Sequence, residues 1–346
     1  MSPTCTTKHN ECGQMRTEQR MILTIAVIAV VVVSTGSYLY FSQMGTKQTL
    51  TISTTTSLYD TGLLDRLKEV YEEENHNVIV AFISAGTGIA LEQAKRGDAD
   101  MILVHAPNLE YKFMREGYGV NRKIFAYNFF VIVGPTSDPA EINGTSPTEA
   151  LQKICFYGRN ATTAVWVSRD DKSGTNQKEK ALWAAAGLDY DEIRNESWFV
   201  SSGSGMGTTL NIANERGLYT LSDIGTYLKY YSDGLIQLKE LVRSDETLLN
   251  VYSAMAVNQT KIPHVKFDIA MDFIKFLVSN DTQELIVSYG LEDYGTPLFY
   301  PAVNVLKSRE PPDVAQWIKN YAFFDSGGTL YECPPEWRYG DYGLYT

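Results

Sequence analysis

Two clusters of hydroxyl-bearing residues constrain this chain most, because each stands where a predicted strand ends and a predicted helix begins. The first cluster, 54–57 (TTTS), follows the strand-like residues 49–53 and precedes an amphipathic segment. The second, 168–175 (SRDDKSGT), contains a guanidinium group and precedes a helix predicted over 176–186. Side-chain donors and unpaired backbone N–H groups converge at such junctions. The two clusters therefore predict an oxyanion site with two halves.

The length and composition of the chain allow two globular lobes. The chain has 346 residues, of which 44% are hydrophobic and 21% are charged. Its formal net charge is −11 and its Lys and Arg residues are scattered, which argues against a nucleic-acid-binding protein with a basic stripe. A bound anion would therefore depend on local donors and not on the overall field.

The segment 22–41 is mostly apolar, and Lys8, Arg16 and Arg20 precede it. This arrangement predicts a cytosolic N-terminus and an extracytoplasmic globular part. About 12 strongly apolar residues would suit a cleaved signal peptide, whereas the full 20 would just span a bilayer. We expect the segment to stay as a membrane anchor, because no cysteine directly follows it to carry a lipid. Secretion after cleavage is the alternative.

Two cysteines and five glycosylation sequons fall in the part predicted to lie outside the cell. Cys155 and Cys333 could form a disulfide or remain as two buried thiols, and their spacing does not decide between these. The sequons fit an exposed surface, although chance alone produces a few, and begin at Asn143, Asn160, Asn195, Asn258 and Asn280.

From residue 49 onward the pattern alternates strands and helices, which predicts an α/β architecture with a mostly parallel sheet. The predicted strands are 78–83, 101–104, 129–133, 163–167, 219–222, 236–241 and 252–257. The predicted helices are 87–95, 109–116, 147–157, 176–186, 208–214, 223–229 and 267–279. We predict an N-terminal stub and anchor (1–47), a discontinuous first lobe (48–134 and 250–301), a second lobe (135–249) and a C-terminal extension (302–346) without assigned function.

Further motifs accompany the two clusters in a fixed order along residues 50–301. They are 86–88 (GTG), 97–100 (GDAD), 117–122 (GYGVNR), 131–135 (VIVGP), 205–208 (GMGT) and 219–223 (YTLSD). With these motifs the chain resembles the tungstate-binding component of tungstate ABC transporters. The resemblance implies a two-lobed, periplasmic-binding-protein-like class II fold with the ligand cleft between the lobes. It also implies a monomer without a cofactor, with an ABC permease as partner and tungsten bound only as the oxyanion.

The resemblance also implies which residues contact the ligand. They are Thr56, Ser57, Ser168, Arg169, Ser173 and Thr175, with Arg169 and Thr175 foremost. Thr87 is a further candidate, either as a donor or as part of a glycine turn. The chain departs from the family pattern at Phe129, where an acidic residue is usual, at Lys172, and in its longer tail.

Each candidate has a structural alternative. Ser and Thr at helix starts serve as N-caps whatever the ligand, and Arg169 could pair with Asp170 or Asp171 at the surface. His105 is expected to be a structural hydrogen-bonding residue, since no nucleophile motif accompanies it. The segment 203–207 (GSGMG) matches neither a phosphate-binding P-loop nor a serine-hydrolase motif.

The sequence thus predicts a non-enzymatic binding protein for tungstate, with molybdate as a second candidate. Its lobes would close about a hinge near 134–135 and Asn250. One alternative is a phosphate-binding protein, which would need Asp170 or Asp171 turned inward to accept the ligand's proton. The other is an extracytoplasmic anion-processing enzyme, for which the four dispersed histidines provide no metal or catalytic cluster.

Overall fold

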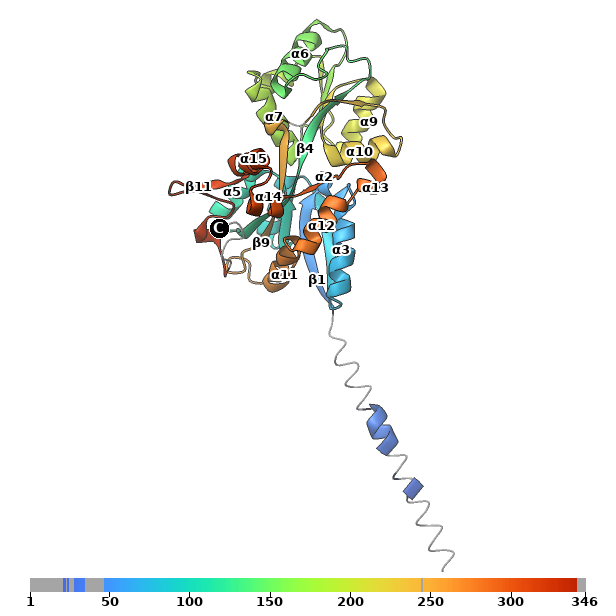
Figure 1. The fold of residues 1–346 in the computed structure, drawn as a ribbon, viewed down its shortest axis with the longest axis vertical. Coiled ribbons are helices and arrows are strands. Elements are labelled where there is room, and N and C mark those ends of the chain that lie inside the picture. The colour runs from blue at the N-terminus through green and yellow to red at the C-terminus, as the bar shows by residue number, and fades with distance from the viewer. Residues whose placement is uncertain (1–20, 23, 25–27, 35–46, 244, 341–346) are drawn as a thin grey trace, which may run out of the picture. The chain divides into compact units, whose positions relative to one another are not determined.

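The computed structural model describes residues 21–22, 24, 28–34, 47–243 and 245–340 (Figure 1). Residues 28–34 are helical and exposed. No helix in these ranges is both long enough and apolar enough to cross a membrane. The predicted anchor, 22–41, lies largely outside the described residues.

The main sheet has the order β10-β4-β9-β3-β1-β2. These strands are β1 (Gln48–Thr55), β2 (Val78–Ala85), β3 (Met101–Val104), β4 (Gly119–Gly134), β9 (Leu249–Val257) and β10 (Tyr300–Pro301). β1 and β3 are parallel, whereas β9 is antiparallel to both β3 and β4. The prediction of a mostly parallel sheet is therefore wrong. The chain leaves the sheet along β4 and returns along β9, so these two strands run in opposite directions.

β4 is much longer than the predicted strand 129–133 and belongs to two sets of pairings (Figure 1). Its residues 119–129 pair with β9, and residues 130–134 pair with β7 (Thr220–Asp223) and β8 (Lys239–Val242). Phe130 and Ile132 enter one core and Val131 and Val133 another, because successive side chains point to opposite faces of a strand. A separate parallel pair joins β5 (Trp166–Ser168) to β6 (Phe199–Ser201).

Helices flank the strands, and all the predicted ones are present with shifted ends. The helices up to β7 are α2 (Thr56–Tyr59), α3 (Leu63–Glu74), α4 (Thr87–Arg96), α5 (Pro107–Arg115), α6 (Pro147–Asn160), α7 (Gly174–Ala185), α8 (Tyr190–Ile193) and α9 (Met206–Arg216). After β7 come α10 (Ile224–Ser232), η1 (Glu246–Leu248), α11 (Phe267–Leu277), α12 (Asn280–Ser288) and α13 (Leu291–Tyr294). Helix α7 begins at Gly174 because the Ser173 hydroxyl accepts a hydrogen bond from Asn176 N.

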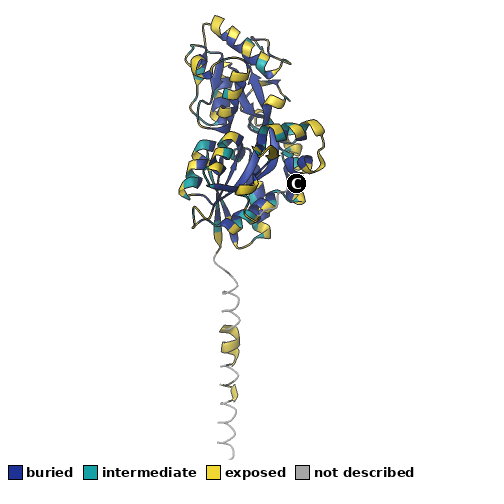
Figure 2. Cartoon of the chain, turned by 90° about the vertical axis from the view of Figure 1, so that its left-hand side faces the viewer, coloured by how far each residue is buried: buried dark blue, intermediate teal, exposed yellow. Residues whose placement is uncertain are grey.

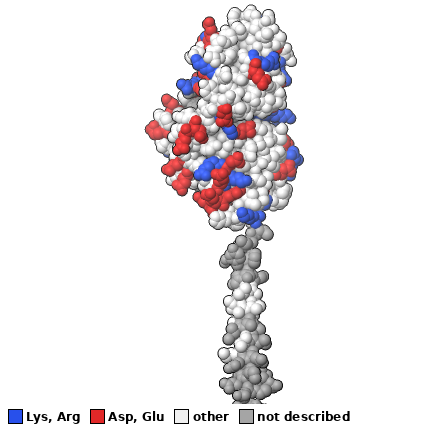
Figure 3. Space-filling view, turned by 90° about the vertical axis from the view of Figure 1, so that its right-hand side faces the viewer, with Lys and Arg blue, Asp and Glu red and all other residues white. Residues whose placement is uncertain are grey.

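Strands β3, β4 and β9 are buried and the helices expose their outer faces (Figure 2). Asp and Glu side chains are interspersed with Lys and Arg on the face in Figure 3, without a continuous basic stripe. Cys155 and Cys333 are free and buried in different hydrophobic cores. Of the two alternatives for these cysteines, the structure thus supports two buried thiols.

The C-terminal extension folds into helices and a hairpin between residues 302 and 340. It forms α14 (Ala302–Ser308), α15 (Pro312–Ala322), the hairpin β11 (Phe324–Ser326) with β12 (Thr329–Tyr331), and η2 (Pro335–Trp337). Buried Arg122 on β4 donates from Nη1 to the carbonyls of Ala322 and Glu332, at 2.8 Å each. Lys123 forms a buried ion pair with Glu332 at 2.9 Å. The extension is therefore an integral part of the core around β4 and β9.

Candidate functional site

Within the 54–57 cluster, the hydroxyls of Thr55 and Thr56 have different roles. Thr55 is the N-cap of α2, and its hydroxyl accepts a hydrogen bond of 3.3 Å from Leu58 N. Thr56 accepts a hydrogen bond of 3.3 Å from Arg169 Nη2. Helix capping thus falls to Thr55, as the structural alternative predicted for the cluster, while the Thr56 hydroxyl keeps its own proton for another acceptor.

Arg169 is only 2% exposed, so it is not part of a surface salt bridge. Its Nε and Nη2 donate to Asp171 Oδ2 at 3.2 and 2.7 Å. Its Nη1 is buried and has no hydrogen-bond partner among the described residues. Asp171 and Thr56 therefore hold the guanidinium in place and leave its Nη1 available to a ligand.

Two further buried hydroxyls, Thr87 Oγ1 and Thr175 Oγ1, also find no partner in the described part of the chain. Each residue lies in the first turn of its helix, α4 or α7, where backbone N–H groups are unpaired and an anion is favoured. A buried polar group without a partner costs about 1–3 kcal/mol, so a cluster of such groups indicates a binding site.

The loops before α4 and α7 are in direct contact. Gly88 N donates a hydrogen bond of 3.1 Å to Lys172 O. A Cβ on Gly88 would lie 3.2 Å from Lys172 Cβ, and one on Gly86 would lie 3.4 Å from Ser173 N. Glycine at 86 and 88 thus permits the close approach that brings the Thr87 segment to the 168–175 segment.

The other three predicted site residues have hydroxyls that are already engaged. Ser57 Oγ lies 3.2 Å from His105 Nε2. Ser168 Oγ donates to Glu179 Oε2 at 2.6 Å, inside the core. Ser173 Oγ donates to Asp171 and caps α7. Thr56, Thr87, Arg169 and Thr175 thus have donors to spare, whereas the hydroxyls of Ser57, Ser168 and Ser173 bond to other protein groups.

Neither aspartate of the motif offers an acceptor to a ligand. Asp170 accepts hydrogen bonds from Tyr190 at 3.1 Å, Arg194 at 2.6 Å and Ser201 at 2.7 Å. Asp171 accepts at Oδ2 from Arg169 and at Oδ1 from the backbone and hydroxyl of Ser173. All four carboxylate oxygens are therefore occupied by protein donors.

His105 connects the site to Asn250 on β9. Nδ1 lies 2.8 Å from Asn250 Oδ1, an acceptor, so Nδ1 carries the proton and Nε2 accepts from Ser57. Burial lowers the pKa of His105 to about 4, and the charges of Arg169 and Lys178 act in the same direction. His105 is thus the neutral structural hydrogen-bonding residue that the sequence predicted.

Sequence analysis did not predict the partners of Asn250. Its Nδ2 donates to Asn128 Oδ1 at 2.9 Å and to the Tyr252 hydroxyl at 2.8 Å. Asn128 and Asn250 stand opposite each other in the β4–β9 ladder. An asparagine within a mostly apolar strand was the signal of this buried network in the sequence.

Comparison with known proteins agrees with this geometry. Residues 42–281 match the PBP (periplasmic-binding-protein) superfamily domain. A candidate ABC transporter anion-binding protein of Haloferax volcanii is 44% identical over 278 residues, which are 79% of this chain and 77% of that protein. The tungstate-binding protein TupA of Peptoclostridium acidaminophilum is 37% identical over 258 residues, which are 74% of this chain and 86% of that protein.

A solved structure extends the comparison to the fold. The tungstate-binding protein TupA of Desulfovibrio alaskensis G20 is 41% identical, with a TM-score of 0.62 over 73% of this chain and 98% of that protein. The match confirms the predicted two-lobed class II fold. The chain therefore belongs to the PBP superfamily and, within it, to the family of tungstate-binding proteins of ABC transporters.

Proposed function

We propose that this chain captures tungstate outside the cytoplasm and delivers it to an ABC permease, without a catalytic step of its own. The observation that carries the proposal is the set of buried, unpartnered donors: Arg169 Nη1, Thr87 Oγ1 and Thr175 Oγ1. They belong to segments that direct contacts bring together. Charge-assisted donation from a guanidinium is the strongest hydrogen bond that a protein offers to an oxyanion.

The occupied carboxylates favour an anion that carries no proton. Tungstate and molybdate are tetrahedral dianions at neutral pH and offer only acceptors. Phosphate keeps a proton near neutrality, which needs an acceptor in the site, and every carboxylate oxygen of Asp170 and Asp171 already accepts from a protein donor. A ligand that carries a proton binds weakly to a buried site without a free acceptor, because its donor is left without a hydrogen bond. Molybdate is therefore the second candidate.

Capture is proposed to occur by closure of the lobes about the strands that connect them. The lobe boundaries of the sequence prediction, at 134/135 and 249/250, remain a proposal. The change of β4 from pairing with β9 to pairing with β7 favours a crossing between Phe129 and Phe130. The pairing of β9 with β4 begins at Leu249, which supports a return of the chain to the first lobe near Asn250.

We further propose that residues 22–41 anchor a monomer to the membrane with its globular part outside. The basic residues before the apolar segment support this orientation. Carbonate extraction of membranes tests it: the full-length protein should stay in the pellet. Recovery of an intact full-length chain in the soluble fraction would contradict the anchor and leave the binding function untouched.

Calorimetric titration of the full-length chain with tungstate, molybdate, sulfate and phosphate tests the function. We expect one tungstate site per chain, and weaker binding of sulfate and phosphate. Two independent sites, a preference for phosphate, or no heat with any of the four anions would overturn the proposal.

A further inference from the structure

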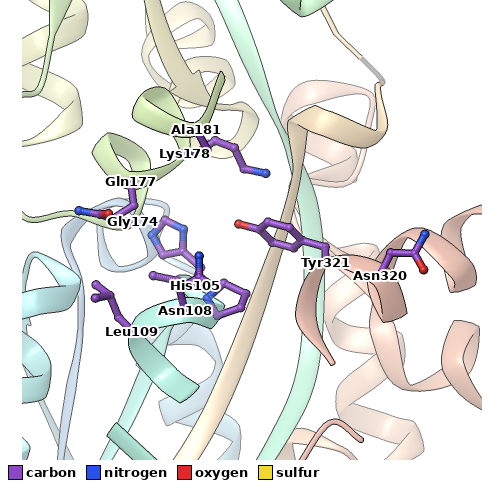
Figure 4. A pocket seen from close by; sticks show the side chains of 11 residues that line it. His105, Asn108, Leu109, Gly174, Gln177, Lys178, Ala181, Asn320 and Tyr321 are labelled. Carbon is purple, nitrogen blue, oxygen red and sulfur yellow. The ribbon is translucent and has the colours of Figure 1, made fainter. Parts of the chain in front are cut away.

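A second cavity, of about 210 Å³, lies beside the candidate oxyanion site. Its lining comes from the start of α5, the first two turns of α7 and the end of α15 (Figure 4). Thr56, Thr87, Arg169 and Thr175 are not part of this lining. The cavity also uses the C-terminal extension, which lies beyond residue 281, where the match to the PBP superfamily domain ends. The lining shares His105 and Gly174 with the site described above, so the cavity adjoins that site and differs from it in its other residues.

Lys178 is a buried cation at this cavity. It is 6% exposed, and its Nζ donates a hydrogen bond of 3.0 Å to Thr247 O and lies 3.9 Å from the centre of the Tyr321 ring. It forms no ion pair with any acidic residue that the structure describes, and burial lowers its pKa to about 7. A buried ammonium without a counter-charge is costly, and an adjacent anion would offset that cost.

The remaining lining suits an organic anion. It contains no Asp or Glu, and its polar side chains include the amides of Asn108 and Gln177. Figure 4 shows the ammonium of Lys178 above the ring of Tyr321. Leu109 and Ala181 provide apolar surface. At about 30 Å³ for each water-sized group, the cavity holds a molecule of about four to six non-hydrogen atoms together with solvent.

We propose that this cavity binds a small monocarboxylate. Its carboxylate pairs with the Lys178 ammonium and accepts from the Tyr321 hydroxyl, while its short apolar part contacts Leu109. The chemistry follows from the lining, because a charge-assisted hydrogen bond between carboxylate and ammonium is the interaction that Lys178 otherwise lacks. This site goes beyond the proposed tungstate function and does not depend on it.

Calorimetric titration of the full-length chain with propionate, up to about 100 mM, tests the proposal directly. We expect saturable binding that weakens about ten-fold or more in Lys178→Met, which removes the charge and keeps most of the volume. Lys180→Met is the matched control: it lies on the same helix, over the Tyr190 ring and outside the cavity, and should bind propionate like the parent.

Two further variants keep the test decisive. Ala181→Leu fills the cavity without changing Lys178, so it should also lose propionate even if Lys178→Met fails to fold. Arg169→Ala should lose tungstate and keep propionate, which separates failure of this site from failure of the proposed function. The proposal is overturned if the parent shows no saturable propionate binding. It is equally overturned if both cavity variants bind like the parent, or if chloride binds as tightly as propionate.

Discussion

Arg169, in the loop before α7, donates a hydrogen bond of 3.3 Å to the hydroxyl of Thr56, at a separation of 113 residues along the chain. This contact joins the two hydroxyl clusters into one site. Asp171 holds the same guanidinium from the other side, at 2.7 Å. The arginine is therefore positioned by one residue of its own loop and one residue of a distant helix start.

Arg169→Ala should weaken tungstate binding by about 2–5 kcal/mol, because it removes a charge-assisted donor from a buried site. Arg169→Lys should have an intermediate effect, since an ammonium keeps the charge and loses the planar fork. Calorimetry measures both. The matched control is Arg194→Ala, which removes the arginine bonded to Asp170 and should bind tungstate like the parent. Tight binding by Arg169→Ala would place the pocket elsewhere.

Thr175→Val and Thr87→Val should change affinity and stability in opposite directions. Each should cost about 1 kcal/mol of tungstate binding, because one neutral donor is lost. Without ligand, each should be neutral or stabilising, since the hydroxyl removed is buried and unpartnered. Titration and thermal unfolding measure the two effects. In the control Thr220→Val, the lost hydroxyl donates to Val167 O at 2.7 Å, so that variant should be destabilised. Equal destabilisation in all three would contradict this account.

Glu332→Leu should destabilise the protein by about 3–5 kcal/mol, because it removes one member of the buried ion pair between Lys123 and Glu332. Denaturant unfolding of the ligand-free protein measures the loss. Glu336→Gln, at an exposed position four residues on, is the control and should change little. A Glu332→Leu variant as stable as the parent would show that the C-terminal extension does not support the core.

His105 should make the stability of the fold depend on pH between about 4 and 6.5. The folded protein keeps the imidazole neutral because burial lowers its pKa to about 4, whereas the unfolded chain takes up a proton near 6.5. The unfolded state therefore binds more protons in this window, and the His105 contribution is lost as the pH falls.

The measurement compares the unfolding free energy of the parent with that of His105→Asn across this window. The difference should rise with pH by up to about 1.4 kcal/mol per unit. Burial raises the pKa of Glu179 to about 7 and opposes this slope, but Glu179 is present in both proteins and cancels in the difference. A constant difference would contradict the buried neutral His105.

The sequence could predict the helices and the ligand segments because their signals are local. Apolar periodicity located α3 and α11, and hydroxyl clusters at strand ends marked the junctions that precede α3 and α7. Which hydroxyl faces the site is not a local property. The Ser168 hydroxyl donates a hydrogen bond to Glu179, whereas the Thr175 hydroxyl has no partner among the described residues. Only the tertiary arrangement decides this difference.

The strand directions and the structure of the C-terminal extension could not be predicted from the sequence either, because both depend on contacts between residues far apart along the chain. The antiparallel return of β9 depends on where the chain re-enters the sheet, more than 100 residues after β4. The burial of Arg122 and Lys123 depends on such distant contacts as well. Glu332, about 210 residues away, forms an ion pair with Lys123 and accepts from Arg122 at its backbone carbonyl, while Arg122 forms its own ion pair with Glu110.

Anomalous scattering from tungsten in crystals grown with tungstate tests the central claim most directly. The account predicts one tungsten per chain, with its oxo groups within about 2.7–3.2 Å of Arg169 Nη1, Thr87 Oγ1 and Thr175 Oγ1. A tungsten peak outside this cluster, for instance against Lys178, or an anion that accepts no hydrogen bond from Arg169, would contradict it.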